Sequence, residues 1–381
     1  MKRHNRVLSI VFAALFFAVL VLPYPLWTAL RGSVDAGNYE NRPLAEMPQP
    51  GQLPIEEFPA RFEAWMEDHA PFRNQWMALN AALNYRLFGT VESETVLLGQ
   101  EDWLFYKNAG DSASLDDYQG TNLYTEEQMA AIAADLNELG QILAQQGIRL
   151  AVLVAPNKEL VYRRYMPEEV PMVNEEGRVD ALVRYLAGQS DVPVVWPEEG
   201  LRRLSATQQV YYRYDTHWND AGAAYASAVL LQALGLAGPL PQQLTYAEDD
   251  APPQMDLAYL SAVWRLLPQD TSYTAANWPA AGEVAHLYSA SDGYYDSYAA
   301  PGAPNAGKLL MFTDSFGAAM QQPLAAAFEE SVFVHINAFG ENTLPDEAPD
   351  VFVVEVSQRY CDRLLDYLPR LVAWARQAYG A

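Results

Sequence analysis

The amino-terminal region carries the strongest hydrophobic pattern in the chain. Residues 7–30 contain no charged side chain, and residues 8–22 are almost entirely apolar. A helix of this length crosses the roughly 30 Å hydrocarbon core of a bilayer. The basic residues Lys2, Arg3 and Arg6 precede it, so we expect this end to stay inside and the rest of the chain to lie outside. A cleaved signal peptide is the alternative, but the long uncharged run favours an uncleaved anchor.

The next segment changes from a linker composition to short amphipathic patterns. Residues 33–60 are rich in Pro, Glu and Gly, which is typical of an extended linker. Residues 55–90 have apolar positions at helical spacing, and residues 96–106 have strand character with a turn near Asp102.

From residue 125 onward, helical patterns alternate with short apolar runs. Thr125 and Gln128 form a capping-box pattern, Gly147 stands where a helix-ending glycine belongs, and the apolar run 150–155 follows at once. The same alternation predicts helices at 179–186, 220–234, 317–328 and 362–378, and strands at 192–196, 308–312, 331–336 and 351–356. This order predicts an α/β fold, with a mostly parallel sheet covered by helices on both faces.

Residues 237–306 interrupt that alternation. They are rich in Pro, Ala, Tyr and Asp and show no regular period. We interpret them as a long insertion between two core elements, which could form a lid or a substrate rim.

Charge and cysteine content narrow the possible functions. The chain has 48 acidic and 24 basic residues, which gives a formal net charge of −24. We therefore do not expect it to bind nucleic acid. Solubility alone is an equally simple reason for this charge. Cys361 is the single cysteine, so the chain offers no internal disulfide and no thiolate metal cluster.

A candidate nucleophile follows the predicted strand at 308–312. Ser315 comes directly after Thr313 and Asp314, before a predicted helix. Open α/β sheets place their sites at this carboxyl edge, where the backbone N–H groups of the following helix can hold an oxyanion. A simple helix cap is the alternative role for Ser315.

A candidate base lies about 100 residues earlier. Asp215 and His217 are two residues apart in a polar, aromatic loop before a predicted helix. A nucleophilic serine needs a base, and the base needs a carboxylate that fixes its tautomer. An incidental surface histidine is the alternative. A metal site is a weaker alternative, because no third histidine or cysteine motif accompanies Asp215 and His217.

Several motifs in this order resemble the alginate O-acetyltransferases of the AlgJ and AlgX type and the related DHHW proteins. The matching stretches are Glu40-Asn41-Arg42, 62–73, 96–106, 154–167, Asp215-Thr216-His217-Trp218-Asn219 and Asp314-Ser315-Phe316. The chain departs from the family at Asp102 and Thr313, where glycine is usual, and at Thr216, where the DHHW motif has histidine. The stretch from Glu355 to Arg359 is similar to a Glu-x-x-x-Arg element.

The resemblance implies an SGNH-hydrolase-like domain with a circularly permuted motif order, in which the Asp-His element precedes the serine. It implies a triad of Ser315, His217 and Asp215, without a metal or a cofactor. We further expect Asn157, Lys158, Asp314, Tyr162 and Arg359 to contact substrate or oxyanion, although loop capping or a solvated face are simpler roles for several of them. Trp264, Trp278 and Tyr294 could stack on sugar faces, with core packing as the simpler alternative.

The resemblance also implies a function and a domain plan. We expect a membrane-anchored extracytoplasmic O-acetyltransferase that acts on an exported or cell-surface polysaccharide, with acetyl groups delivered by a membrane-bound O-acyltransferase. A carbohydrate acetylesterase and a non-catalytic, membrane-tethered scaffold are the alternatives. The predicted parts are a basic flank and anchor at 1–32, a linker and extension at 33–120, and a catalytic domain at 121–381.

Overall fold

A computed structural model describes residues 2–39, 43–107, 110, 112–279, 283–290, 294–338 and 349–380. The chain divides into two compact units, which we treat separately. Unit 1 holds Met1–Ser93 and Ala258–Leu267, and unit 2 holds Glu94–Leu257 and Pro268–Ala381. The predicted boundaries at 33 and 121 stay predictions, and the motif Glu40-Asn41-Arg42 lies outside the described residues.

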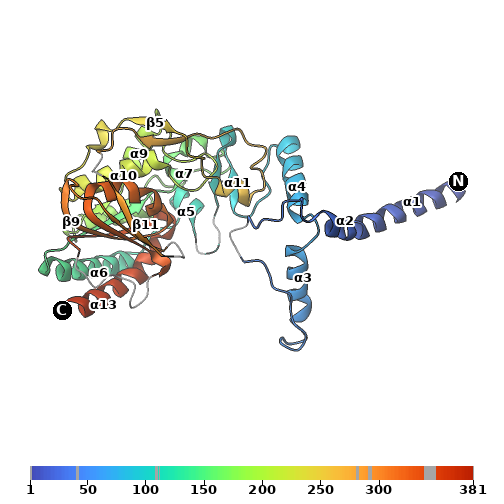
Figure 1. Cartoon of the computed structure of the whole chain (residues 1–381), viewed down its shortest axis with the longest axis horizontal. Coiled ribbons are helices and arrows are strands. Elements are labelled where there is room, and N and C mark those ends of the chain that lie inside the picture. Colours follow the sequence, from blue (N-terminus) through green and yellow to red (C-terminus); the bar gives the residue numbers. More distant parts are fainter. Residues whose placement is uncertain are drawn as a thin grey trace. The chain divides into compact units, whose positions relative to one another are not determined.

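Unit 1 contains the apolar amino-terminal segment. Its helices are α1 (Lys2–Val21), α2 (Pro23–Leu30), α3 (Phe58–Asp68) and α4 (Arg73–Phe88) (Figure 1). The segment Val7–Leu30 reaches a mean hydropathy of 2.6, and none of it is buried against the protein. It is therefore long and apolar enough to cross a membrane, a property that signal sequences share.

Unit 2 is built on a seven-stranded sheet in the order β4-β3-β11-β9-β10-β8-β7. Strands β4, β3, β11, β9 and β10 run parallel, while β8 is antiparallel to β10 and β7 is antiparallel to β8. The predicted, mostly parallel sheet is thus confirmed. The strand bounds are β3 (Arg149–Ala155), β4 (Val194–Val195), β7 (Ala285–Ser289), β8 (Tyr295–Ala299), β9 (Asn305–Thr313), β10 (Phe328–His335) and β11 (Val351–Ser357).

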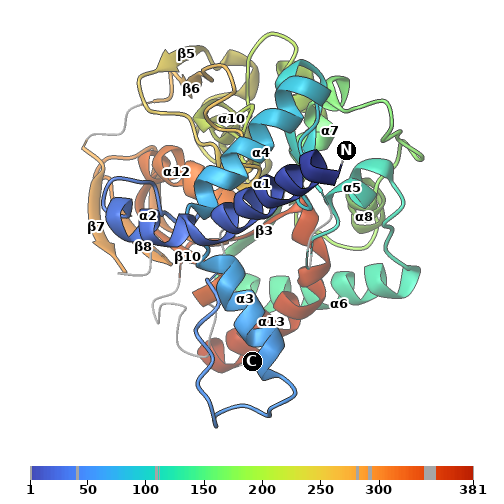
Figure 2. The same cartoon turned by 90° about the vertical axis from the view of Figure 1, so that its right-hand side faces the viewer.

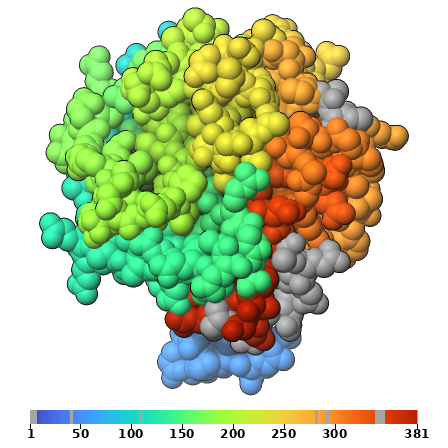
Figure 3. Space-filling model, turned by 90° about the vertical axis from the view of Figure 1, so that its left-hand side faces the viewer, coloured from blue at the N-terminus to red at the C-terminus, as the bar shows by residue number. Residues whose placement is uncertain are grey.

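Helices cover both faces of this sheet, as the alternating pattern predicts. Helices α6 (Glu126–Gln145), α8 (Arg178–Leu186) and α13 (Leu364–Tyr379) bury one face, and α6 lies beside α13 (Figure 1 and Figure 2). Helices α7 (Lys158–Val161), α9 (Glu198–Leu204), α10 (Asp220–Ala233) and α12 (Gln321–Ala327) cover the other face. Figure 3 shows the end of unit 2 where the teal residues of α6 meet green and yellow segments at the surface.

Local sequence signals explain where α6 starts and stops. The Thr125 hydroxyl accepts the Gln128 backbone N–H, and the Gln128 side chain accepts the Thr125 N–H in return. Gly147 adopts φ +77° just after the helix, a left-handed conformation that glycine reaches without a steric cost. The capping prediction is therefore confirmed at both ends.

Other elements differ from the sequence prediction. The predicted helix 317–328 is divided in two. Residues Ser315–Met320 form the 3₁₀ helix η4, and the α-helix α12 begins at Gln321. Residues 237–306, predicted to lack regular elements, contain β5 (Tyr246–Asp249), β6 (Ser272–Ala275), β7 and β8. The last two extend the main sheet. They are short strands of mostly exposed or partly exposed residues, so their sequences show no alternation of hydrophobic and polar positions.

The remaining elements of unit 2 are short. Strands β1 (Val96–Leu98) and β2 (Leu104–Tyr106) form the predicted hairpin, in which Asp102 adopts φ 62°. This left-handed conformation explains why a glycine suits that position. The short helices of unit 2 include α5 (Ser114–Gln119) and η6 (Gln358–Arg363). Helix α11 (Asp256–Leu260) starts with the last two residues of the segment Glu94–Leu257.

Candidate active site

The parallel strands bring the predicted site residues to one edge of the sheet. Strand β9 ends at Thr313, just before Ser315, while β3 leads to Asn157 and β11 leads to Arg359. Because β3, β11 and β9 are adjacent and parallel, their carboxyl ends meet at one edge. These segments therefore lie together although they are far apart in the sequence.

Ser315 stands at the first position of η4 and its side chain is exposed. Asp314 caps this short helix, since its carboxylate accepts the Phe316 N–H at 2.9 Å. A second carboxylate oxygen of Asp314 accepts the Ser357 N–H at 2.7 Å, which joins the serine turn to the end of β11. Both oxygens of Asp314 thus hold the backbone, so its role here is to shape the turn.

A tight loop presents the predicted base. An isolated bridge pairs Tyr211 with Trp218, and Asn219 caps α10 by accepting the Gly222 N–H at 3.1 Å. The loop between these two fixed points carries Asp215 and His217. Its ends are therefore held by the sheet-like bridge and by the helix that follows.

Asp215, His217 and Ser315 form a continuous hydrogen-bonded series. The Asp215 carboxylate lies 2.8 Å from His217 Nδ1, and His217 Nε2 lies 2.8 Å from Ser315 Oγ. Asp215 also accepts the N–H groups of His217 at 2.9 Å and of Asp256 at 2.8 Å, and it is only 2 % exposed. With Nδ1 facing the carboxylate, Nε2 of a neutral imidazole is free to accept the serine proton.

Phe316 and Trp218 connect the two halves of this series. The Trp218 indole N–H donates to the Phe316 carbonyl at 2.9 Å. The Phe316 ring centroid lies 4.9 Å from that of His217. The residue after the serine thus packs on the imidazole, which limits the positions His217 can take.

The carboxyl of Asp215 is ionised throughout the neutral range. Burial favours its neutral form, but the hydrogen bond and the charge of His217 outweigh burial and lower the pKa of Asp215 to about 2. Because this folded-state pKa lies below the usual value of 3.8, the stability it contributes is present above pH ~4 and is lost as the pH falls toward 2.

Replacing Asp215 with asparagine is therefore expected to cost stability in a pH-dependent way. The cost is about 2 kcal/mol at pH ~6 and falls by about 1 kcal/mol at pH ~3, because the carboxylate of the unfolded chain is already mostly protonated there while the native one is still ionised. Urea unfolding of both proteins at the two pH values, followed by tryptophan fluorescence, measures this difference. A cost that stays the same at both pH values would contradict the assigned role of the charge.

Lys158 lies under the Asp215 loop. Its ammonium donates to the carbonyls of Asp215 at 2.6 Å and of Tyr212 and Arg213 at 3.2 Å each. Burial lowers the pKa of Lys158 to about 8, so it still carries three N–H donors at pH 7. All three are used by the loop, which contradicts the prediction that Lys158 contacts an oxyanion; its geometry positions the triad loop.

Tyr162 also supports this loop. It is 1 % exposed, its hydroxyl accepts the Val210 N–H at 2.9 Å, and its ring stacks on Trp103 at 4.2 Å. A side chain so placed has no open surface for a sugar. The prediction of a substrate contact at Tyr162 is therefore wrong, and the simpler role of core packing applies.

Asn157 and Arg359 lie beside each other at the site edge. The Asn157 side-chain carbonyl accepts the Arg359 N–H at 3.2 Å, which orients the amide. Its Nδ2 group is buried and has no hydrogen-bond partner in the part of the chain that the structure describes. The Arg359 guanidinium lies 3.5 Å from the Thr216 hydroxyl and packs over Phe316 at 5.2 Å.

A buried carboxyl that the sequence analysis did not assign lies behind the serine. Glu355 Oε2 accepts the Thr313 hydroxyl at 2.6 Å and the Asp314 N–H at 3.0 Å. Complete burial and the nearby Asp314 carboxylate raise the pKa of Glu355 well above its usual value. The one available signal was its place as the first residue of the Glu-x-x-x-Arg stretch, at the end of a predicted buried strand.

The comparisons with known proteins find similarity to O-acetyltransferases. Residues 96–277 match the family model described as an SGNH hydrolase-like domain of the acetyltransferase AlgX. Because of this similarity, we refer to residues 96–277 as the AlgX-type domain. The matched range includes Asp215 and His217 and ends before Ser315, so the family resemblance is confirmed, while the permuted motif order stays a prediction.

Curated proteins that are similar to this chain are named after alginate O-acetylation. The chain is 26 % identical over 240 residues to a probable alginate O-acetylase AlgJ of Azotobacter vinelandii, covering 62 % of this chain and 56 % of that protein. It is 28 % identical over 183 residues to the Pseudomonas putida protein of the same name, covering 46 % and 44 %. The chain thus spans about half the length of the curated relatives it matches.

Solved structures show similarity over a larger share of the chain. The O-acetyltransferase domain of Pseudomonas putida AlgJ matches at 19 % identity and a TM-score of 0.44, covering 73 % of this chain and 99 % of that one. Bacillus cereus PatB1 with a sulfonyl adduct matches at 15 % identity and a TM-score of 0.48, covering 70 % and 95 %.

A metal in the AlgX-type domain would have to compete with the hydrogen bonds at the triad. Asp215, His217 and Asp256 bring possible ligand atoms within 4.8 Å of one another. Asp256, however, already accepts the N–H of Thr216 at 2.8 Å and its hydroxyl at 2.7 Å. The donor set is thus arranged to hold an imidazole, and we assign it that role.

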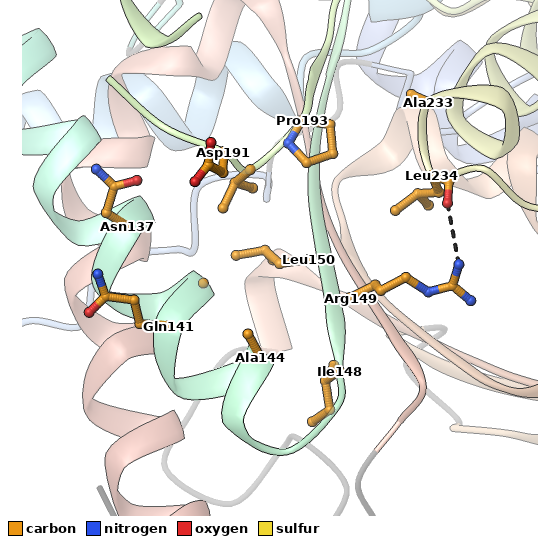
Figure 4. Close-up of a pocket in the computed structure, with 12 residues that line it drawn as sticks. Asn137, Gln141, Ala144, Ile148, Arg149, Leu150, Asp191, Pro193, Ala233 and Leu234 are labelled. Atoms are coloured by element: carbon orange, nitrogen blue, oxygen red, sulfur yellow. Dashed lines mark hydrogen bonds between the residues drawn. The ribbon is translucent and has the colours of Figure 1, made fainter. Parts of the chain in front are cut away.

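A pocket elsewhere on the AlgX-type domain lies far from the triad. It encloses about 430 Å³ at the amino end of β3, lined by residues such as Asn137, Gln141, Arg149 and Asp191 (Figure 4). Strand β3 has 7 residues, so this pocket is roughly 20 Å from the edge that carries Asn157. It is separate from the candidate active site.

Proposed function

We propose that the chain is a membrane-anchored O-acetyltransferase that transfers acetyl groups to hydroxyls of a polysaccharide outside the cytoplasmic membrane. The observation that carries this proposal is the hydrogen-bonded series from buried Asp215 through His217 to exposed Ser315. The similarity to proteins named probable alginate O-acetylase supports acetyl transfer to a glycan.

The reaction proceeds through an acetyl ester on Ser315. The Ser315 oxygen attacks the acetyl carbonyl while His217 Nε2 takes its proton, and His217 then returns that proton to the departing donor group. In the second half, His217 takes the proton of an acceptor hydroxyl as its oxygen attacks the acetyl-serine. Breakdown of this second intermediate releases the acetylated acceptor and returns the proton to Ser315. Asp215 stabilises the imidazolium in both halves.

Two donors are candidates for holding the oxyanion. The Ser315 N–H lies at the start of η4, directly beside the reacting oxygen. Asn157 offers a buried amide N–H group whose direction is fixed by the bond from Arg359. Donors held in place before the reaction stabilise developing charge without a further cost of reorientation.

The amino-terminal segment supports the proposed placement outside the membrane. We propose that Val7–Leu30 stays attached as a single-pass anchor, with the AlgX-type domain on the extracytoplasmic side. Acetyl groups must then reach this side from the cytoplasm, so a membrane-bound O-acyltransferase is the proposed donor partner. The acetyl step itself needs no cofactor in this scheme.

An acetylesterase would use the same three residues, with water as the acceptor. The test uses the purified full chain in detergent, p-nitrophenyl acetate as donor, and oligosaccharides as acceptors, with acetylated products identified by mass spectrometry. We expect acetyl-oligosaccharide with the wild type and none with Ser315→Ala. Acetate release that oligosaccharides never divert would support the esterase, and transfer that continues without Ser315 would overturn the proposed triad.

A further inference from the structure

A strip of polar and aromatic residues continues outward from Ser315 along the sheet. In the register of β10 against β9, His335 lies beside Thr313, two residues before Ser315. The His335 N–H donates to the Tyr294 carbonyl at 2.8 Å, which places Tyr294 beside His335 on the far side from β9. With strands about 4.8 Å apart, Tyr294 lies about 10 Å from the strand that carries the serine.

The side chains of this strip lie on the same face as the serine helix. Tyr298 packs in the cluster that contains Met320 of η4 and Leu324 of α12. Side chains of a strand alternate, so Asp296 and Tyr294 share the face of Tyr298. The stack of Tyr294 on His335, with ring centroids 4.8 Å apart and planes 24° apart, agrees with that assignment.

The outer part of the strip is a network of hydrogen-bonding groups. Asp296 lies 3.0 Å from His286 Nε2 and 3.4 Å from Gln321 Nε2, while the Tyr298 hydroxyl donates to Gln321 Oε1 at 2.9 Å. The Asp296 side chain is 13 % exposed and that of His286 is 48 % exposed. The network is therefore ordered by its own contacts and reaches the surface.

His335 supplies a neutral donor at the inner end. Its Nδ1 accepts the Asn337 N–H at 3.1 Å, so the proton of the neutral ring is on Nε2. Burial lowers the pKa of His335, against the attraction of the Asp314 carboxylate, so the ring is uncharged at pH 7.

We propose that the strip formed by His335, Tyr294, Asp296, Gln321 and His286 binds the acceptor glycan, and that it selects neutral sugars over uronic acids. This proposal rests on the function proposed above and adds the place and class of the acceptor. The apolar C–H face of a pyranose matches an aromatic ring, and its hydroxyls match planar carboxylate and amide groups. A chain lying on the strip presents a hydroxyl to Ser315 at its inner end.

Charge is the reason for the selection. The five residues of the strip include no lysine or arginine. The Asp296 carboxylate is the one acidic group among them. A sugar carboxylate there would meet a like charge, in a chain whose formal net charge is −24. The curated relatives are named for alginate, so this inference separates the present chain from them in acceptor class.

The other aromatic residues predicted to stack on sugars lie elsewhere. Trp264 packs with Tyr39 and Tyr259 inside unit 1, at centroid distances of 5.2 and 5.5 Å. Trp278 packs partly buried against the core of unit 2. Of the three predicted residues, Tyr294 is the one that the sheet register places at the serine edge.

The test measures binding separately from catalysis. Ser315→Ala full chain in detergent is titrated by calorimetry with cellohexaose, mannohexaose and hexamannuronate, alone and combined with Tyr294→Ala or Asp296→Asn. We expect a neutral hexasaccharide to bind more tightly than hexamannuronate, and Tyr294→Ala to weaken it about tenfold. Asp296→Asn should reduce the difference in affinity between the neutral hexasaccharide and hexamannuronate, because it removes the carboxylate that repels the uronic acids.

Tyr288 is the matched control. It is 58 % exposed on β7, but its ring contacts Tyr295, which packs on the opposite face of the sheet. Tyr288→Ala should leave the dissociation constants within about twofold. Binding of no hexasaccharide, tighter binding of hexamannuronate, or equal affinity with and without Tyr294 would each overturn the proposal. If the wild type hydrolysed p-nitrophenyl acetate no faster than Ser315→Ala, the proposed function would be overturned instead.

Discussion

Ser315→Ala is expected to lower kcat/KM for hydrolysis of p-nitrophenyl acetate by about 10³-fold or more. The alanine removes the oxygen that lies 2.8 Å from His217 Nε2 and that would carry the acetyl ester. The exposed position of Ser315 means that the fold does not depend on its hydroxyl. The measurement is steady-state kinetics with the full chain in detergent.

The same substitution at an exposed serine away from the site gives the control. Ser289 is exposed on the edge strand β7, so Ser289→Ala should keep both activity and stability. Equal rates for the wild type and Ser315→Ala would show that the observed hydrolysis does not use the triad. In that case the scaffold alternative would gain support.

Lys158→Met is expected to destabilise unit 2 by about 3 kcal/mol and to lower kcat in the protein that remains folded. Methionine fills a similar volume but cannot donate to the carbonyls of Tyr212, Arg213 and Asp215. The Arg213 carbonyl keeps the Leu104 N–H as a donor, so the cost comes mainly from the other two, at about 1–3 kcal/mol each. Urea unfolding measures the stability, and ester hydrolysis measures kcat.

Lys308→Met serves as the control for this change, because Lys308 is only half-buried near the other end of β9. We expect a change within about 0.5 kcal/mol there. If Lys158 positions the triad loop, its replacement lowers kcat more than it raises KM for the small ester. A stability loss with unchanged kcat would limit Lys158 to a packing role.

Local signals in the sequence predicted the frame of the site correctly. The buried run 150–155 became β3, and the run before Ser315 became β9, because parallel strands buried on both faces read as continuous apolar segments. Asp215 and His217 could be proposed together because they are neighbours in the chain. Their approach to Ser315, 98 residues from His217, could be expected from the shared edge of a parallel sheet.

The contacts that support the site could not be predicted in the same way. Lys158 meets carbonyls 54–57 residues away, and nothing in its own neighbourhood indicates where that loop lies. Strand β7 has five exposed residues and therefore lacks a hydrophobic alternation. Thr313 in place of glycine is explained only by the fold, since its side chain fills the space above Gly317, where a Cβ would lie 1.6 Å from the Thr313 hydroxyl oxygen.

The central claim is that an acetyl group passes through Ser315. Full chain in detergent is mixed with p-nitrophenyl acetate, quenched in acid after short times, digested, and analysed by mass spectrometry of the peptide that contains Ser315. The account predicts an acetyl group on Ser315 that forms before product, disappears when an oligosaccharide acceptor is added, and is absent in His217→Ala. Product that forms while the Ser315 peptide stays unmodified at every time, or an acetyl group that no acceptor or water removes, would contradict it.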